Sequence, residues 1–134
     1  MKKIMLTTIM LFVSIVVFIG CQKDSTLTIK PQAKKISFAV SFKKNLVPLF
    51  TKYCAVAGCH VGGGQAPDLT ASKAFGAITS PSAGMISLSD PQSSKLYGYL
   101  TGKLTPAMPM GKSSNPEDLN DLFLAWITQG AKNN

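Results

Sequence analysis

Two cysteines and a histidine stand close together in a chain that has few other reactive side chains. The stretch CAVAGCH places Cys54 and Cys59 five positions apart, and His60, the only histidine of the sequence, follows the second cysteine directly. Thiolates and imidazoles bind soft and borderline metal ions, and thiols also form disulfides and thioethers. The pattern therefore predicts a disulfide, a metal site or a covalently attached group at residues 54–60.

These three alternatives differ in what else they require. A disulfide suits an oxidising compartment and an even number of thiols, but it would close a very short loop and leave His60 unexplained. Zinc takes four ligands, usually from two cysteine or histidine pairs, and the sequence has no second pair. Covalent haem uses the motif C-x-x-C-H. Here the loop holds four residues instead of two, which costs little closure entropy, and Gly58 can take up the turn.

Further segments match a known family in order along the chain. Residues 40–134 resemble the small class I cytochrome c domains of bacteria, many of which are lipoproteins and some of which have an expanded C-x4-C-H loop. VSFKKNLVPLFTKYCAVAGCH matches the family's first helix and haem-binding motif, DPQSSKLYGYLTG resembles the helix before the ligand loop, and AMPMGKSSNPEDLNDLFLAWITQGAKNN resembles the closing segment. The resemblance implies an all-α fold of few helices wrapped around one covalently bound haem c.

The resemblance also implies roles for individual residues. Cys54 and Cys59 would form the haem thioethers, and His60 would be the proximal ligand of the iron. Met108, in the dipeptide MP, would be the distal ligand, with Met110 as its competitor; a thioether ligand favours ferrous iron and raises the reduction potential. Pro67 resembles the position whose carbonyl accepts a hydrogen bond from the proximal histidine, which fixes the imidazole tautomer.

The first twenty residues are typical of an export signal. MKKIMLTTIMLFVSIVVFIG has a short positive start, an apolar run slightly shorter than a membrane-spanning helix needs, and a small residue before Cys21. The ending FIGC resembles the lipobox of bacterial lipoproteins, which implies that Cys21 is acylated and anchors the mature chain. We therefore expect an exported protein, lipid-anchored to a cell envelope membrane of a Gram-negative bacterium, at its periplasmic face or at the cell surface.

The charge is basic but not concentrated in the predicted domain. The whole chain has 14 lysines, no arginine and 6 acids, a formal charge of +8. From residue 41 onward there are 8 lysines and 5 acids, a net +3. This distribution argues against a nucleic-acid partner. The family resemblance implies redox proteins as partners, and the N-terminal lipid implies a membrane.

The pattern of apolar residues predicts helices after a polar linker. We expect a signal peptide at 1–20, a flexible tether at 21–40 and a cytochrome c domain at 41–134. Helices are predicted in 41–54 with Pro48 in its first turn or at a kink, weakly in 68–78, from a cap at Asp90 to about Gly102, and from a cap at Asn115 to Gly130. A domain of this size has a core of marginal size, which a large apolar cofactor would complete.

These expectations describe a membrane-tethered single-haem electron carrier rather than an enzyme. With both axial positions of the iron filled, no site is open for a substrate. Two alternatives belong to other classes. In the first, the Met108 bond is labile and the protein is a haem-based sensor or ligand binder. In the second, the chain is a haem-free lipoprotein interaction module with a Cys54–Cys59 disulfide.

Overall fold

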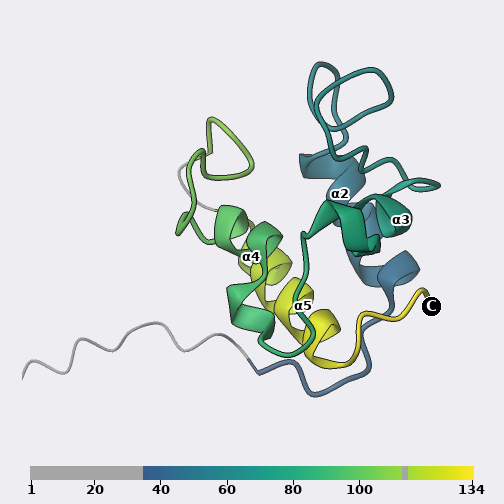
Figure 1. Ribbon diagram of the computed structural model, residues 1–134, viewed down its shortest axis with the longest axis vertical. Helices are drawn as coiled ribbons and strands as arrows, with labels where there is room; N and C mark the ends of the chain where they lie inside the picture. Colours follow the sequence, from purple (N-terminus) through teal and green to yellow (C-terminus); the bar gives the residue numbers. More distant parts are fainter. Residues whose placement is uncertain (1–34, 113–114) are drawn as a thin grey trace, which may run out of the picture. The chain divides into compact units, whose positions relative to one another are not determined.

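The computed structural model describes residues 35–112 and 115–134, which belong to one compact unit, Ala33–Asn134. Secondary structure in these residues is helical, without a strand, so the predicted all-α class is confirmed. The elements follow one another along the chain (Figure 1): η1 Phe42–Leu46, α2 Val47–Tyr53, α3 Ala74–Thr79, η2 Pro81–Ala83, η3 Pro91–Ser93, α4 Lys95–Leu100 and α5 Glu117–Thr128. The predicted signal and lipid site at Cys21 lie outside the described residues.

The first predicted helix is present as two successive segments, η1 and α2, with Pro48 near the start of the second. Ser41 caps it reciprocally: its Oγ accepts from the N–H of Lys44 at 3.2 Å, and its own N–H donates to Asn45 Oδ1 at 2.8 Å. The turn η1 has π-helical geometry, and α2 begins at Val47. Pro48 therefore lies in the first turn of α2, where its missing N–H removes no hydrogen bond of that helix.

The prediction of one continuous helix from Asp90 to Gly102 is wrong. It forms two pieces, η3 and α4, because Ser94 between them is extended, with ψ of 127°. Ser94 is buried, and its Oγ accepts from the N–H of Ser87 at 3.0 Å, which holds the break against the preceding segment. Asp90 occupies the cap position of η3 but makes no capping hydrogen bond with its side chain.

The last helix is present, but its predicted cap is wrong. Pro116, not Asn115, is the N-cap of α5. The side-chain amide of Asn115 donates to the carbonyl of Leu100 and, at 2.9 Å, to Asn120 Oδ1. Leu100 ends α4, where carbonyls lack partners within the helix. Asn115 therefore ties the start of α5 to the end of α4.

Aromatic rings join the first and last helical segments. Phe42 lies 5.0 Å from Trp126 and 6.0 Å from Phe50, measured between ring centroids. Phe123 lies 5.7 Å from Trp126 and 6.3 Å from Phe50. These four side chains are at most 1% exposed. The core that positions the loops is thus an aromatic cluster between η1, α2 and α5.

The segment before the first helix is attached to the C-terminal end of α5. Val40 is buried, its N–H donates to Gln129 Oε1 at 2.8 Å, and Gln129 Nε2 donates to the carbonyl of Phe38 at 3.0 Å. Packing therefore extends N-terminal to residue 41, into the range that the sequence assigns to the tether. Each helix within 35–112 and 115–134 is too short or too polar to cross a bilayer.

Candidate functional site

The cysteine and histidine positions are held in one loop that begins where α2 ends. Cys54 is the C-cap of α2, and its N–H donates to the carbonyl of Phe50 at 2.8 Å. The loop then closes on itself, because the N–H of His60 donates to the carbonyl of Cys54 at 3.1 Å. Gly58 has φ of +77°, which is the turn expected of it. The loop of four residues between the cysteines is thus a closed, hydrogen-bonded turn.

The two thiols of this loop have different surroundings. Both are free in the structure. Cys54 is 7% exposed, and burial, followed by the nearby Cys59 thiol, raises the pKa of Cys54 to about 11. Cys59 is exposed to solvent. The pair thus consists of one inner and one outer thiol that interact electrostatically.

We predict that the two thiols of haem-free protein differ in reactivity. In chain made in a reducing cytoplasm, iodoacetamide at pH 8 should alkylate Cys59 at least about tenfold faster than Cys54, because only the thiolate reacts and Cys54 is both buried and protonated. Peptide mass spectrometry of timed samples measures both rates. Equal rates at the two cysteines would contradict the burial of Cys54.

His60 is oriented by two backbone carbonyls. Its Nδ1 lies 3.1 Å from the carbonyl oxygen of Pro67 and 3.2 Å from that of Gln65. A carbonyl oxygen only accepts, so Nδ1 must carry the proton in these contacts. The neutral ring then has its lone pair on Nε2. The Pro67 contact is the one that the family resemblance implies, whereas Gln65 is a second acceptor that the sequence did not indicate.

A small network holds Pro67 and the residues that follow it. Asp68 Oδ1 accepts from the hydroxyl of Thr70 at 2.7 Å and from its N–H at 3.0 Å, and the N–H of Leu69 donates to the carbonyl of His60 at 2.8 Å. Leu69 is buried, so it also fixes this segment to the core. The spacing Asp-x-Thr is a signal for such a turn, and sequence reasoning did not use it.

This network gives a pH-dependent stability. The hydrogen bonds from the Thr70 hydroxyl and N–H lower the pKa of Asp68. A lowered folded-state pKa stabilises the fold above the unfolded value of about 3.9, and the contribution is lost as pH falls through the folded value. We therefore expect Asp68→Asn to melt below wild type at pH 7, with the gap narrowing below about pH 4. A gap that is constant from pH 7 to pH 2 would contradict this assignment.

Met108 lies on a second loop, which is anchored to α4. Its N–H donates to the carbonyl of Tyr99 at 2.9 Å, and the N–H of Leu104 donates to the carbonyl of Gly98 at 3.0 Å. Met108 is partly buried, whereas Met110 is 66% exposed. In Figure 1 the loop that follows α2 lies at the upper right of the view, and the loop that follows α4 lies at the upper left. The structure brings Cys54, Cys59, His60 and Pro67 together and attaches Met108 to a different element.

The donor set of these loops contains the residue types that could hold a covalent haem c. No group of three or more His, Cys, Asp or Glu side chains that could hold a metal ion occurs among the residues that the structure describes. Two free thiols for thioether bonds, an imidazole with its Nε2 lone pair available and a partly buried thioether are the groups that a His/Met-ligated haem c requires.

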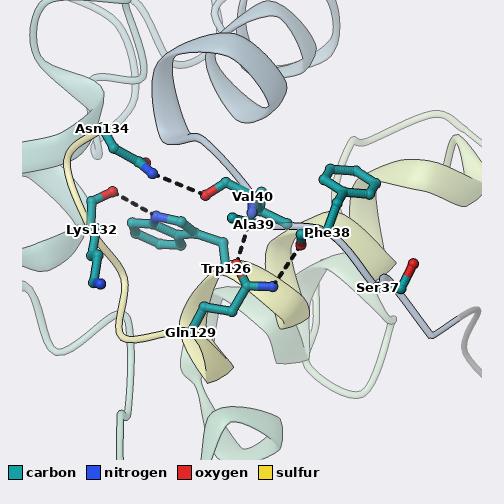
Figure 2. A pocket seen from close by; sticks show the side chains of 8 residues that line it. All are labelled: Ser37, Phe38, Ala39, Val40, Trp126, Gln129, Lys132 and Asn134. Atoms are coloured by element: carbon teal, nitrogen blue, oxygen red, sulfur yellow. Dashed lines mark hydrogen bonds between the residues drawn. The ribbon is translucent and has the colours of Figure 1, made fainter.

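A hollow of about 460 Å³ lies elsewhere, at the C-terminal end of α5 (Figure 2). Its polar groups bind one another: Trp126 Nε1 donates to the carbonyl of Lys132 at 2.9 Å, and Gln129 bonds Phe38 and Val40. The opposite end of α5 is the one that Asn115 ties to α4, and 12 helical residues, about 18 Å of helix, separate the two ends. The hollow is therefore a seam between backbone segments and contains none of the predicted site residues.

The chain was compared with models of protein families, with curated proteins and with solved structures, and none of them matches.

Proposed function

We propose that this protein is an electron carrier of the class I cytochrome c kind, with one covalently attached haem c. The observation that carries the proposal is the arrangement around His60, where two backbone carbonyls hold Nδ1 in the same loop that carries two free thiols. This arrangement leaves Nε2 as the ligating nitrogen. A disulfide would not use it, and zinc would need further ligands.

Residues of both loops would hold the cofactor. Cys54 and Cys59 would supply the thioether sulfurs, and His60 and Met108 the axial ligands. The carbonyls of Pro67 and Gln65 keep the proton of His60 on Nδ1 and orient the ring. Haem, when bound, supplies an iron that takes up and gives back one electron. The aromatic cluster between η1, α2 and α5 is a rigid base on which such a loop keeps its geometry during electron transfer.

Two further parts of the proposal concern location and chemistry. The chain would be exported and attached to a cell envelope membrane through lipid on Cys21, with redox proteins as its partners. The protein would not be an enzyme, because His60 and Met108 would fill both axial positions and leave none for a substrate. The sensor alternative requires a labile Met108 ligand, and the partial burial of Met108 together with its backbone attachment to α4 favours a fixed one.

The proposal is tested on the exported protein by peroxidase staining of a denatured gel and a reduced-minus-oxidised spectrum. Covalent haem stays with the band after denaturation, so wild type should stain and the Cys54→Ser, Cys59→Ser double variant should not. The spectrum should show a low-spin haem in both oxidation states. A wild-type band without stain, with the protein folded and exported, would instead favour the haem-free interaction module.

A further inference from the structure

Gly64 occupies a position in the loop after His60 where no side chain fits. A Cβ built on Gly64 would lie 2.2 Å from the carbonyl oxygen of Cys59 and 3.1 Å from that of Val61. Outside its own residue and the two chain neighbours, a real Cβ atom essentially never comes within 3.0 Å of a heavy atom, and here the obstacle is backbone rather than a flexible side chain. The φ of Gly64 is not in the left-handed region, so space is the reason for glycine at this position.

This close approach belongs to a turn that closes over Cys59. The carbonyl of Cys59 accepts from the N–H of Val61 at 3.0 Å and from the N–H of Gln65 at 2.8 Å, and the N–H of Gly64 donates to the carbonyl of Val61 at 2.8 Å. The Cys59 carbonyl oxygen, which accepts two of these bonds, is the atom that a Cβ on Gly64 would meet first. Because the chain passes so close to Cys59, Gln65 follows at a place where its carbonyl reaches His60 Nδ1 at 3.2 Å.

We infer that Gly64 is a positioning residue that sets the orientation of His60 through the Gln65 carbonyl. Without a side chain at 64 the turn closes, and Nδ1 of His60 is shared between the carbonyls of Gln65 and Pro67. A side chain at position 64 forces the turn away from Cys59 and moves the Gln65 carbonyl out of reach of His60 Nδ1. The carbonyl of Pro67 is then the single acceptor for that nitrogen. The consequence for iron rests on the proposed function: two acceptors make the imidazole a stronger donor to iron than one acceptor does, which favours the ferric state.

Gly64→Ala tests this inference, and Gly62→Ala is its matched control. A Cβ on Gly62 would meet only Asp68 Oδ2, at an ordinary 3.6 Å, and the φ of Gly62 is not in the left-handed region. We expect the Nδ1–H proton of His60, followed by ¹⁵N NMR of the reduced protein, to exchange with solvent about tenfold faster in Gly64→Ala than in wild type, because one of its two hydrogen bonds is lost. Gly62→Ala should exchange at the wild-type rate.

The haem-loaded protein gives a second readout. The midpoint potential of Gly64→Ala should rise, and that of Gly62→Ala should stay at the wild-type value. Should Gly64→Ala not fold, Gln65→Pro keeps Gly64 but removes the N–H that donates to Cys59, and it should accelerate the same proton exchange. Wild-type exchange in Gly64→Ala, or equal acceleration in both glycine variants, would overturn the inference.

The outcome can be separated from that of the proposed function. If wild type carries no haem, the electron-carrier proposal fails, but the Nδ1–H exchange of haem-free protein still tests the role of Gly64. If wild type carries haem and Gly64→Ala leaves both the exchange and the potential unchanged, the proposed function stands and the positioning role of Gly64 is wrong.

Discussion

Met108→Ala should lower the reduction potential of the haem-loaded protein by about 0.1 V or more, a fraction of the roughly 0.8 V range that axial ligands set. The thioether is a soft ligand without a proton, and it stabilises ferrous iron relative to water or another oxygen ligand. The same change should convert the ferric spectrum from low spin to high spin. Potentiometric titration followed by absorbance measures both effects on one sample.

Met110→Ala is the matched control for this variant. Met110 stands two residues away in the same loop but is 66% exposed, so its removal should leave the potential and the spectrum unchanged. A changed spectrum in Met110→Ala together with an unchanged one in Met108→Ala would show that Met110, and not Met108, is the distal ligand. A wild-type spectrum in both variants would favour the sensor alternative, in which the iron binds exogenous ligands.

Phe123→Ala should lower the free energy of unfolding by about 3–5 kcal/mol, the usual cost of removing a fully buried aromatic ring. Phe123 is 0% exposed, and its ring contacts Trp126 and Phe50, so the deletion opens a cavity where α5 meets the first helices. This loss is a large part of the 5–15 kcal/mol that stabilises a typical domain. Urea unfolding followed by tryptophan fluorescence measures it, at equal haem loading of both proteins.

Leu88→Ala is the control for the core. Leu88 is 60% exposed, and shortening an exposed side chain changes the free energy of unfolding by about 0.5 kcal/mol or less. A cost below about 1 kcal/mol for Phe123→Ala would contradict the aromatic cluster as the core of the fold.

The helical class and the buried face of α5 were predictable because apolar periodicity reports burial directly. Leu119, Phe123, Trp126 and Ile127 recur at spacings of three and four, and all are buried on one face of α5. The place of Pro48 in a first helical turn was predictable too, because a residue without an N–H is tolerated at few other positions of a helix.

The helix ends were less predictable because their partners lie far away in the sequence. Asn115 is a good N-cap by residue type, but its amide donates to Leu100, 15 residues earlier. Ser94 breaks the helix predicted from Asp90 to Gly102 through its bond with Ser87, a residue that lies outside that predicted helix. Local propensity ranks the candidates for a cap, and tertiary contacts decide which one is used.

In the candidate site, too, the features that depend on residue type were predictable and those that depend on tertiary contacts were not. The C-x4-C-H motif identified the thiols and the histidine, and the family resemblance pointed to the Pro67 carbonyl. The Gln65 carbonyl could not be found in the same way, because a backbone acceptor is independent of residue type. Its only trace in the sequence is Gly64, whose significance depends on a close approach that only coordinates reveal.

The most direct test of the haem c account is the intact mass of the exported, denatured protein, followed by peptide mapping of residues 54–60. We predict the mass of one haem added to the chain, carried by the peptide that contains Cys54, Cys59 and His60. A chain without added tetrapyrrole, in which the sulfurs of Cys54 and Cys59 are bonded to each other, would contradict it.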